Sequence, residues 1–215
     1  MKHLRPLKTN KSPEQCFETL LLEMADLFES DGCEAGGETA DAFRQAAGEV
    51  IAIPATPYKY DYLVSDALKN ATHPCAVAAR GCQQFLQWEA AGSILDKHVP
   101  TDVSDAFTSN YLMGPGCLIE HSSLRAGLFI QNPKSYYPLH NHDAVETYIM
   151  IEGVGYWTRG DTTARHSVGD VIHHPSRMLH AFRTLEKPLV ALWRWSGDID
   201  ADTYRLHPDK HSNKS

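Results

Sequence analysis

The sequence lacks the features that define several large protein classes. Its five cysteines, Cys16, Cys33, Cys75, Cys82 and Cys117, are odd in number and form no C-x-x-C pair, which argues against a disulfide framework or a zinc knuckle. The net charge is −7 without basic runs among the aromatic residues, so nucleic acid is not an expected partner. No stretch approaches the length of a membrane span, and no apolar signal core follows the basic N-terminal residues. We therefore expect a soluble cytoplasmic protein with reduced thiols and no membrane association.

The composition is that of a globular protein. The chain has 215 residues, of which 42% are hydrophobic and 22% are charged. This length suits one large domain, or a compact domain with a sizeable extension, and it is sufficient to bury a core.

The first half of the sequence has the periodicity of helices. Ser12 is followed at once by a proline and three positions later by a glutamine, which is a capping-box start. The apolar residues that follow have the spacing of one helical face and predict a helix over 13–29. A second helix is expected over about 39–50, and a third helical region within 76–93.

The second half consists of short β-rich runs that are separated by glycine and aspartate. The runs are Leu124–Gln131, Val145–Glu152, Gly155–Thr158, Asp170–His173, His180–Arg183 and Leu189–Trp195. This texture predicts an antiparallel sandwich or barrel of the jelly-roll kind. We expect a helical portion over 1–105 that packs on or caps a β-barrel over 106–205. The polar tail over 206–215 is expected to be disordered.

Several side chains of the β-rich half are potential metal donors. If 140–150 is one extended strand, then His140, His142, Glu146 and Tyr148 point to the same side, because strand side chains alternate. His180 arrives from a later strand. Together these residues offer nitrogen and oxygen donors that suit Zn, Fe, Mn, Co or Ni.

A pair of adjacent histidines, His173 and His174, competes with His180 for the role of the late ligand. Neighbouring strand residues face opposite ways, so at most one of the pair can face the cavity. We retain His180 as the expected ligand and treat one of the pair as a pocket residue. With 12 histidines in the chain some spacings arise by chance, but the donors, glycines and proline all fall in register.

The spacing of these residues resembles the two cupin motifs. An H-x-H-x3-E-x6-G string begins at His140, and a G-x5-P-x4-H string begins at Gly169. Arg177 stands where the second motif usually carries glycine, and Thr184 replaces the asparagine that commonly closes it. Neither position is a metal ligand, so the resemblance implies a cupin β-barrel with an N-terminal helical extension.

Aromatic residues around the donors narrow this resemblance. Tyr137 precedes the first motif, Tyr148 lies within it, and Trp195 ends the last predicted strand with Trp193 on the same parity. This pattern resembles the cupin dimethylsulfoniopropionate (DMSP) lyases, most closely over 120–196. That family also carries helices before its barrel.

The resemblance implies a metal-dependent carbon–sulfur lyase that cleaves DMSP by β-elimination to dimethyl sulfide and acrylate. A divalent transition metal would be held by the counterparts of four residues, His140, His142, Glu146 and His180. Tyr148 would act as the base, with Tyr137 as the next candidate.

The substrate would be a small zwitterion with a carboxylate at one end and a sulfonium at the other. The methylated sulfur has no hydrogen-bond donor, so aromatic faces are expected to recognise it by cation–π contacts. The candidates for this contact are Tyr136, Tyr137, Trp193 and Trp195.

Two alternatives remain at this level, because the cupin fold supports many functions. One is an iron-dependent cupin dioxygenase that acts on a small acid or thiol. The other is a non-catalytic cupin that binds a small ligand. In each case the helical portion is expected to close one mouth of the barrel or to pack against a second subunit in a homodimer.

Overall fold

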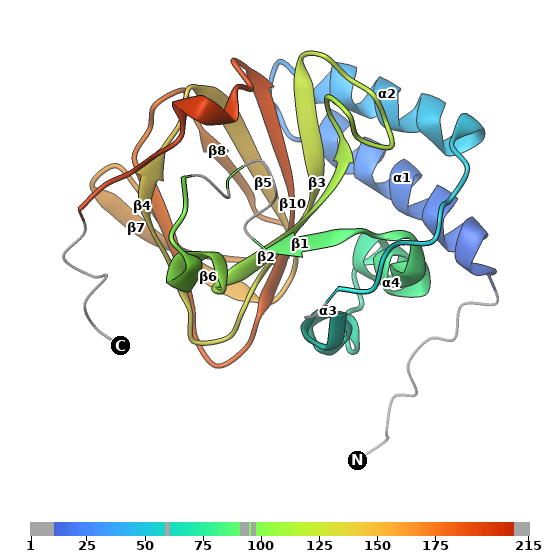
Figure 1. Ribbon diagram of the computed structural model, residues 1–215, viewed down its shortest axis with the longest axis horizontal. Helices are drawn as coiled ribbons and strands as arrows, with labels where there is room; N and C mark the ends of the chain where they lie inside the picture. The colour runs from blue at the N-terminus through green and yellow to red at the C-terminus, as the bar shows by residue number, and fades with distance from the viewer. Residues whose placement is uncertain (1–10, 59–60, 91–94, 96–97, 209–215) are drawn as a thin grey trace.

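The N-terminal part of the protein is helical. The computed structural model describes residues 11–58, 61–90, 95 and 98–208. Its helices are α1 (Pro13–Glu29), α2 (Gly36–Glu49), α3 (Asp61–Leu68) and α4 (Pro74–Gly81), followed by the 3-10 turn η1 (Gln83–Phe85) (Figure 1). The first two predicted helices are confirmed, and the Ser12 side chain caps α1 as the capping box predicts.

The predicted third helical region is only partly helical. Helix α4 ends at Gly81, and the chain then extends into strand β1 (Trp88–Ala90), so the helical prediction is wrong beyond residue 81. Residues 91–93 of that prediction lie outside the described ranges. The extended segment is favoured because Trp88, almost fully buried, pairs with Asn110 on the neighbouring strand.

Two antiparallel sheets form the β-rich half. After the short helix α5 (Thr101–Ser104), the strands are β2 (Phe107–Met113), β3 (Leu124–Gln131), β4 (Tyr136–Asn141), β5 (Ala144–Glu152), β6 (Val154–Arg159), β7 (Thr162–Ser167), β8 (Val171–His174), β9 (His180–Thr184) and β10 (Leu189–Gly197), with the turn η2 (Ala201–Thr203) and strand β11 (Arg205–Leu206) at the end. One sheet has the order β1-β2-β3-β10-β5-β8 and the other the order β11-β4-β9-β6-β7. All the predicted strands are present, and the fold is mainly β, a cupin barrel with N-terminal helices.

Residues 140–150 are not one extended strand, so the condition under which the four side chains would share one strand face is not met. Strand β4 ends at Asn141 in the five-stranded sheet, and β5 begins at Ala144 in the six-stranded sheet. The chain crosses between the sheets at His142 and Asp143. Arg177, at a left-handed φ of 63°, donates its backbone N–H to the His142 carbonyl and pairs with the Asp143 carboxylate at 2.8 Å.

The helices cover the outer face of the six-stranded sheet (Figure 1). The protein has one hydrophobic core between the helices and this sheet and a second core inside the barrel. Alternate residues of β5 belong to different cores: Ile149 and Ile151 pack with the helices, whereas Tyr148 and Met150 point into the barrel. The helical portion therefore packs on the side of the barrel.

The β-structure extends beyond both ends of the barrel segment predicted over 106–205. Strand β1 comes from the predicted helical portion and pairs with β2. Leu206, assigned to the disordered tail, pairs with His140 in β11, and residues 209–215 of that tail lie outside the described ranges.

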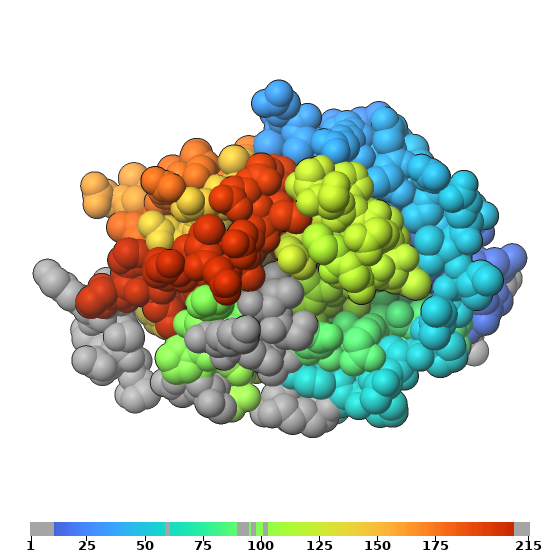
Figure 2. Space-filling view, turned by 45° about the horizontal axis from the view of Figure 1, so that its top comes forward, coloured from blue at the N-terminus to red at the C-terminus, as the bar shows by residue number. Residues whose placement is uncertain are grey.

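The chain after β10 folds back over one end of the barrel. Figure 2 shows this segment in red, against the green and yellow-green segments from the beginning of the barrel. Arg125 donates to the Ile199 carbonyl at 3.2 Å, and His98 lies 3.1 Å from Asp202. These contacts bring Tyr204 to the barrel interior, where its side chain is almost fully buried.

Two observations concern the disulfide bonds and membrane spans considered in the sequence analysis. None of the five cysteines forms a disulfide bond. Within the described ranges, no helix is long and apolar enough to cross a membrane.

Candidate metal centre and pocket

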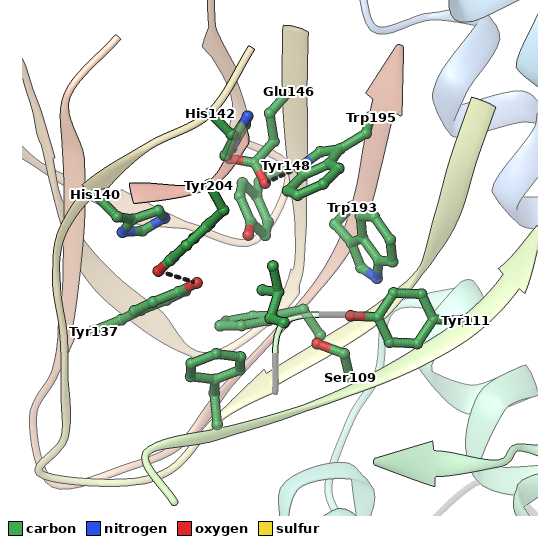
Figure 3. Close-up of a pocket in the computed structure, with 13 residues that line it drawn as sticks. Ser109, Tyr111, Tyr137, His140, His142, Glu146, Tyr148, Trp193, Trp195 and Tyr204 are labelled. Atoms are coloured by element: carbon green, nitrogen blue, oxygen red, sulfur yellow. Dashed lines mark hydrogen bonds and ion pairs between the residues drawn. The ribbon is translucent and has the colours of Figure 1, made fainter. Parts of the chain in front are cut away.

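A pocket opens between the two sheets at the end of the barrel that the C-terminal segment covers (Figure 3). It is lined by Leu95, Phe107, Ser109, Tyr111, Phe129, Tyr137, His140, His142, Glu146, Tyr148, Trp193, Trp195 and Tyr204. The lining is mostly aromatic, and its histidines and its carboxylate gather on one side, which we call the polar side (Figure 3). Most of the residues singled out in the sequence therefore converge here.

Three potential metal ligands meet beside this pocket. His142, Glu146 and His180 each offer a donor atom, and these atoms all lie within 4.8 Å of one another. His142 comes from the crossing between sheets, Glu146 from β5 and His180 from β9. Nε2 of His180 lies 3.1 Å from the Glu146 Oε2 atom, and Nε2 of His142 lies 3.5 Å from it.

The two histidines present lone pairs to the centre of this cluster. Nδ1 of His142 lies 3.1 Å from the Ala144 carbonyl, and Nδ1 of His180 lies 2.8 Å from the Met178 carbonyl. A carbonyl only accepts, so each Nδ1 carries the proton and each Nε2 is unprotonated. Both Nε2 atoms are buried without a hydrogen-bond partner, which fits a metal ion between them and the carboxylate.

His140 has a different setting from the other predicted ligands. Among the described residues it is not part of the group whose donors lie within 4.8 Å of one another. Its ring stacks on Tyr137 at a centroid distance of 4.1 Å, and its Nδ1 lies 2.7 Å from the Pro138 carbonyl. Burial, followed by the proximity of His180, holds the pKa of His140 well below its usual value. Its role as a ligand stays a prediction.

Both oxygens of the Glu146 carboxylate are held by N–H donors. The indole of Trp195 donates to Oε1 at 2.7 Å, and His174 lies 2.8 Å from Oε2 through its Nδ1. Burial opposes ionisation of Glu146, but the surrounding histidines, His142 first, outweigh it and keep the pKa of Glu146 well below its usual value. The carboxylate is thus a charged, oriented acceptor.

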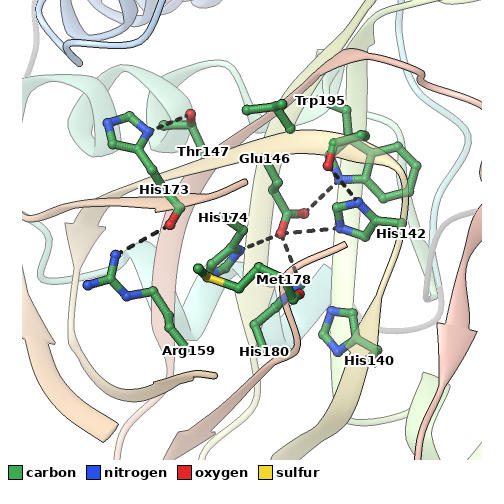
Figure 4. Close-up of polar contacts among 12 residues, drawn as sticks. His140, His142, Glu146, Thr147, Arg159, His173, His174, Met178, His180 and Trp195 are labelled. Carbon is green, nitrogen blue, oxygen red and sulfur yellow. Dashed lines mark hydrogen bonds and ion pairs between the residues drawn. The ribbon is translucent and has the colours of Figure 1, made fainter. Parts of the chain in front are cut away.

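The adjacent histidines on β8 face opposite ways, as predicted. His174 points into the barrel toward Glu146, whereas His173 points toward the helices and contacts Thr147 (Figure 4). Burial lowers the pKa of His174 to about 3, so its ring is neutral.

Three tyrosine hydroxyls are buried near the cluster. Tyr204 donates to the Tyr137 hydroxyl at 2.9 Å (Figure 3). Tyr148 lies on β5 two residues after Glu146, and its ring meets the Phe129 ring edge to face at a centroid distance of 5.5 Å. Burial first, and then the negative charge of Glu146, raises the pKa of Tyr148 well above its usual value.

The side of the pocket away from the cluster is an aromatic wall. Tyr111 and Trp193 meet edge to face at 5.0 Å, and Trp193 meets Trp195 edge to face at 6.2 Å. Trp193 donates its indole N–H to the Asn110 carbonyl at 3.3 Å, so its ring orientation is fixed.

Tyr136, predicted to contact substrate, lies on the opposite face of β4 from Tyr137. It lines a separate surface hollow, with the Arg183 guanidinium 5.3 Å from its ring centroid. Adjacent strand residues point to opposite sides, and Tyr137 takes the inward position. The structure therefore corrects the expectation for Tyr136.

Sequence reasoning missed three polar residues of the pocket, Ser109, Tyr111 and Tyr204. Ser109 and Tyr111 share one parity on β2, which an alternation search upstream of residue 124 would have found. Tyr204 carries no such signal, because it reaches the pocket only through the fold-back after β10.

Comparisons with known proteins agree with this geometry. The sequence profile described as dimethylsulfoniopropionate lyase matches residues 44–191, which include helices and barrel. The DMSP lyase DddQ of Ruegeria pomeroyi is 33% identical over 109 residues, which cover 50% of this chain and 54% of DddQ. The chain thus spans about half the length of this curated relative in that alignment.

Solved structures extend the similarity over the whole fold. The crystal structure of DddQ from Ruegeria pomeroyi DSS-3 has a TM-score of 0.64 and 26% identity, covering 86% of this chain and 93% of that one. A structure described with the DMSP lyases RdDddP and RnDddQII has a TM-score of 0.67 and covers 92% of this chain and 100% of that one; at 21% identity it shows the shared fold alone. The match to the family profile over most of the chain shows that this protein belongs to the dimethylsulfoniopropionate lyase family.

Proposed function

We propose that this protein is a metal-dependent carbon–sulfur lyase that cleaves DMSP to dimethyl sulfide and acrylate. The observation that carries the proposal is the placement of the His142, Glu146 and His180 cluster beside a pocket that also contains Tyr148 and an aromatic wall. A substrate with a carboxylate at one end and a sulfonium at the other matches a pocket with the donor cluster on one side and the aromatic wall on the other. Membership of the family supports the same reaction.

The ligand set fits a divalent transition metal such as Fe, Zn, Mn, Co or Ni, because it combines two neutral imidazoles with a carboxylate. When bound, such an ion would supply positive charge that neutralises the substrate carboxylate and lowers the pKa of nearby acids. We propose His142, Glu146 and His180 as its holders, with His140 as a fourth candidate.

Tyr148 is the proposed base. Its phenolate oxygen takes the proton from the carbon beside the carboxylate. The electron pair of that C–H bond forms the double bond of acrylate, and the C–S bond breaks with its electrons going to sulfur. Dimethyl sulfide therefore leaves as a neutral molecule. The positive charge of the sulfonium disappears, and the negative charge of the Tyr148 phenolate is neutralised by the proton that it accepts.

The hydroxyl pair of Tyr137 and Tyr204 lies near the polar side of the pocket. Because Tyr204 donates to the Tyr137 oxygen, the Tyr137 proton remains available to a second acceptor. We propose that it donates to a carboxylate oxygen of the substrate. Tyr137 is the alternative base.

The sulfonium end is proposed to contact the aromatic wall. Trp193 presents a fixed ring there, and Tyr111 stands edge to face beside it. Desolvated cation–π contacts are worth about 2 kcal/mol. Tyr137 and Trp195 remain candidates for the same contact, whereas Tyr136 is replaced in this role by Tyr111.

The test is headspace detection of dimethyl sulfide from purified protein with DMSP, under air and under nitrogen, with and without a chelator. We expect equal release in both atmospheres and loss of release with the chelator. Release that requires oxygen would favour the dioxygenase, and binding of DMSP without turnover would favour a non-catalytic cupin. Tyr136→Phe is a matched control, because its ring lies outside the pocket.

Two further aspects belong to the proposal. The cysteines, none of which forms a disulfide bond, support the predicted cytoplasmic location, since thiols are kept reduced there. The homodimer stays a prediction.

A further inference from the structure

We infer that His174 is a positioning residue whose imidazole N–H holds Oε2 of Glu146 in the orientation that the metal requires. The inference rests on the metal site of the proposed function. It concerns a residue that carries no ligand role, because among the described residues the donors that meet within 4.8 Å belong to His142, Glu146 and His180.

The strand register places His174 directly beside Glu146. Trp195 on β10, Glu146 on β5 and His174 on β8 are directly opposite one another across three neighbouring strands. This cross-strand row lies on the inner face of the sheet (Figure 4). Directly paired side chains on one sheet face are within reach of one another, so the row explains why both Glu146 oxygens find N–H donors.

The chemistry of the contact determines the tautomer of His174. Glu146 is an acceptor when ionised, so Nδ1 of His174 carries the proton that bridges the 2.8 Å distance. Its Nε2 is then unprotonated, and it is buried without a hydrogen-bond partner. The ring is fully buried, so no bulk water competes for the N–H.

His174 also contacts a second member of the cluster. Its ring stacks on His180 at a centroid distance of 4.0 Å and an interplanar angle of 18°. One side chain therefore fixes the carboxylate by a hydrogen bond and one imidazole by packing. Such outer contacts orient ligands and raise metal affinity.

The neighbouring His173 anchors the strand that carries His174. Its Nε2 lies 2.8 Å from the Asp31 carbonyl, and its Nδ1 lies 3.0 Å from the Thr147 hydroxyl. Strand β8 is an edge strand of its sheet, and these contacts tie it to the turn after α1. The two histidines thus have separate roles on opposite faces.

The experiment compares His174→Leu with His174→Asn, because the asparagine amide places an N–H near the position of Nδ1. Metal affinity is measured by competition with a chromogenic chelator, and folding by circular dichroism. We expect His174→Leu to bind the metal about 10–100-fold more weakly and His174→Asn to stay close to the parent protein. His121→Asn is the matched control, because His121 pairs with Glu38 of helix α2 and belongs to neither the cluster nor the pocket lining, and it is expected to keep the parent's affinity.

Parent-like affinity in His174→Leu would overturn the inference. So would equal weakening in both variants, because that result assigns the effect to packing and not to the N–H. If His174→Leu does not fold, His174→Gln replaces it, since its amide N–H lies near the position of Nε2; equal affinity in the Asn and Gln variants then overturns the inference. Metal affinity requires no turnover, so absence of dimethyl sulfide release from the parent protein would refute the proposed function alone.

Discussion

Trp195 donates its indole N–H to Oε1 of Glu146 at 2.7 Å. Its ring also packs on His142 at a centroid distance of 4.4 Å, so Trp195 contacts two of the three clustered donor residues. The sequence suggested Trp195 as a face for the sulfonium. In the structure its defined interactions orient the cluster, whereas Trp193 and Tyr111 line the pocket and have no contact of this kind with the clustered donors among the interactions described above.

Trp195→Phe keeps an aromatic ring and removes the N–H. Hydrogen bonds to charged groups contribute about 1.5–3 kcal/mol, so we expect metal affinity to fall roughly ten- to hundredfold. Chelator competition measures this loss. Trp193→Phe is the control, because its N–H binds the Asn110 carbonyl, and it should leave metal affinity unchanged. Equal affinities in the two variants would contradict the assignment.

Tyr148→Phe removes the proposed base. We expect unchanged folding and metal content with turnover reduced by about 10²–10⁴-fold, the range for loss of general base catalysis. Dimethyl sulfide release and elemental analysis on the same sample provide the measurement. If release persists, the base lies elsewhere, and Tyr137→Phe identifies whether it is Tyr137.

The four candidate ligands are expected to differ in importance. His142→Ala and His180→Ala each remove a donor of the cluster and should lose metal by elemental analysis. His140→Ala should retain it, because His140 stacks on Tyr137 and does not belong to the group of described residues whose donor atoms lie within 4.8 Å of one another. Loss of metal in His140→Ala would restore the four-ligand centre implied by the family resemblance.

The motif spacing predicted the residues of the site better than it predicted the local structure. The donors were expected to share one strand face, but the strand breaks between Asn141 and Ala144. His142 and Glu146 still converge because the crossing at residues 142–143 brings two sheets together at one end of the barrel. Three of the four predicted ligands, His142, Glu146 and His180, thus come together although the extended strand assumed for them is broken.

The interactions that complete the site depend on strand register. Periodicity shows that His174 and Trp195 can point inward, but it does not show which residues lie opposite them. Register also pairs Arg194 with Thr147 on the outer face, beside the inner pair of Trp195 and Glu146. Such cross-strand rows arise only when the sheets assemble, so sequence alone could not supply them.

The cysteines should fall into two reactivity classes. Cys16, Cys75 and Cys82 are buried, whereas Cys33 and Cys117 are partly exposed. Burial raises the pKa of Cys75, Cys82 and also Cys117, so at neutral pH the reactive thiolate is scarcer at each than at an ordinary thiol, and access of the reagent separates the two classes. Labelling of the native protein followed by mass spectrometry should modify the partly exposed pair first. Rapid native labelling of Cys75 would contradict this order.

Asp31 and Arg194 form an ion pair between the helical layer and the barrel, with both side chains fully buried at 2.6 Å. Arg194 also donates to the Thr147 hydroxyl at 2.9 Å and lies over the Phe28 ring. Removing one partner leaves an uncompensated buried charge. Asp31→Leu or Arg194→Met alone should therefore lower the free energy of unfolding by about 3–5 kcal/mol, as measured by denaturant titration.

The double variant Asp31→Leu with Arg194→Met should recover much of that loss, because two apolar side chains bury no charge. Arg44→Met is the matched control: Arg44 pairs with Asp26 and Glu29 at the surface of the helices, where such pairs contribute about 0–1 kcal/mol. If Asp31→Leu and Arg194→Met each lower the free energy of unfolding no more than Arg44→Met does, the Asp31–Arg194 pair does not hold the helices to the barrel. If instead the double variant is as unstable as the worse single variant, the loss comes from the packing of the new side chains and not from a buried charge.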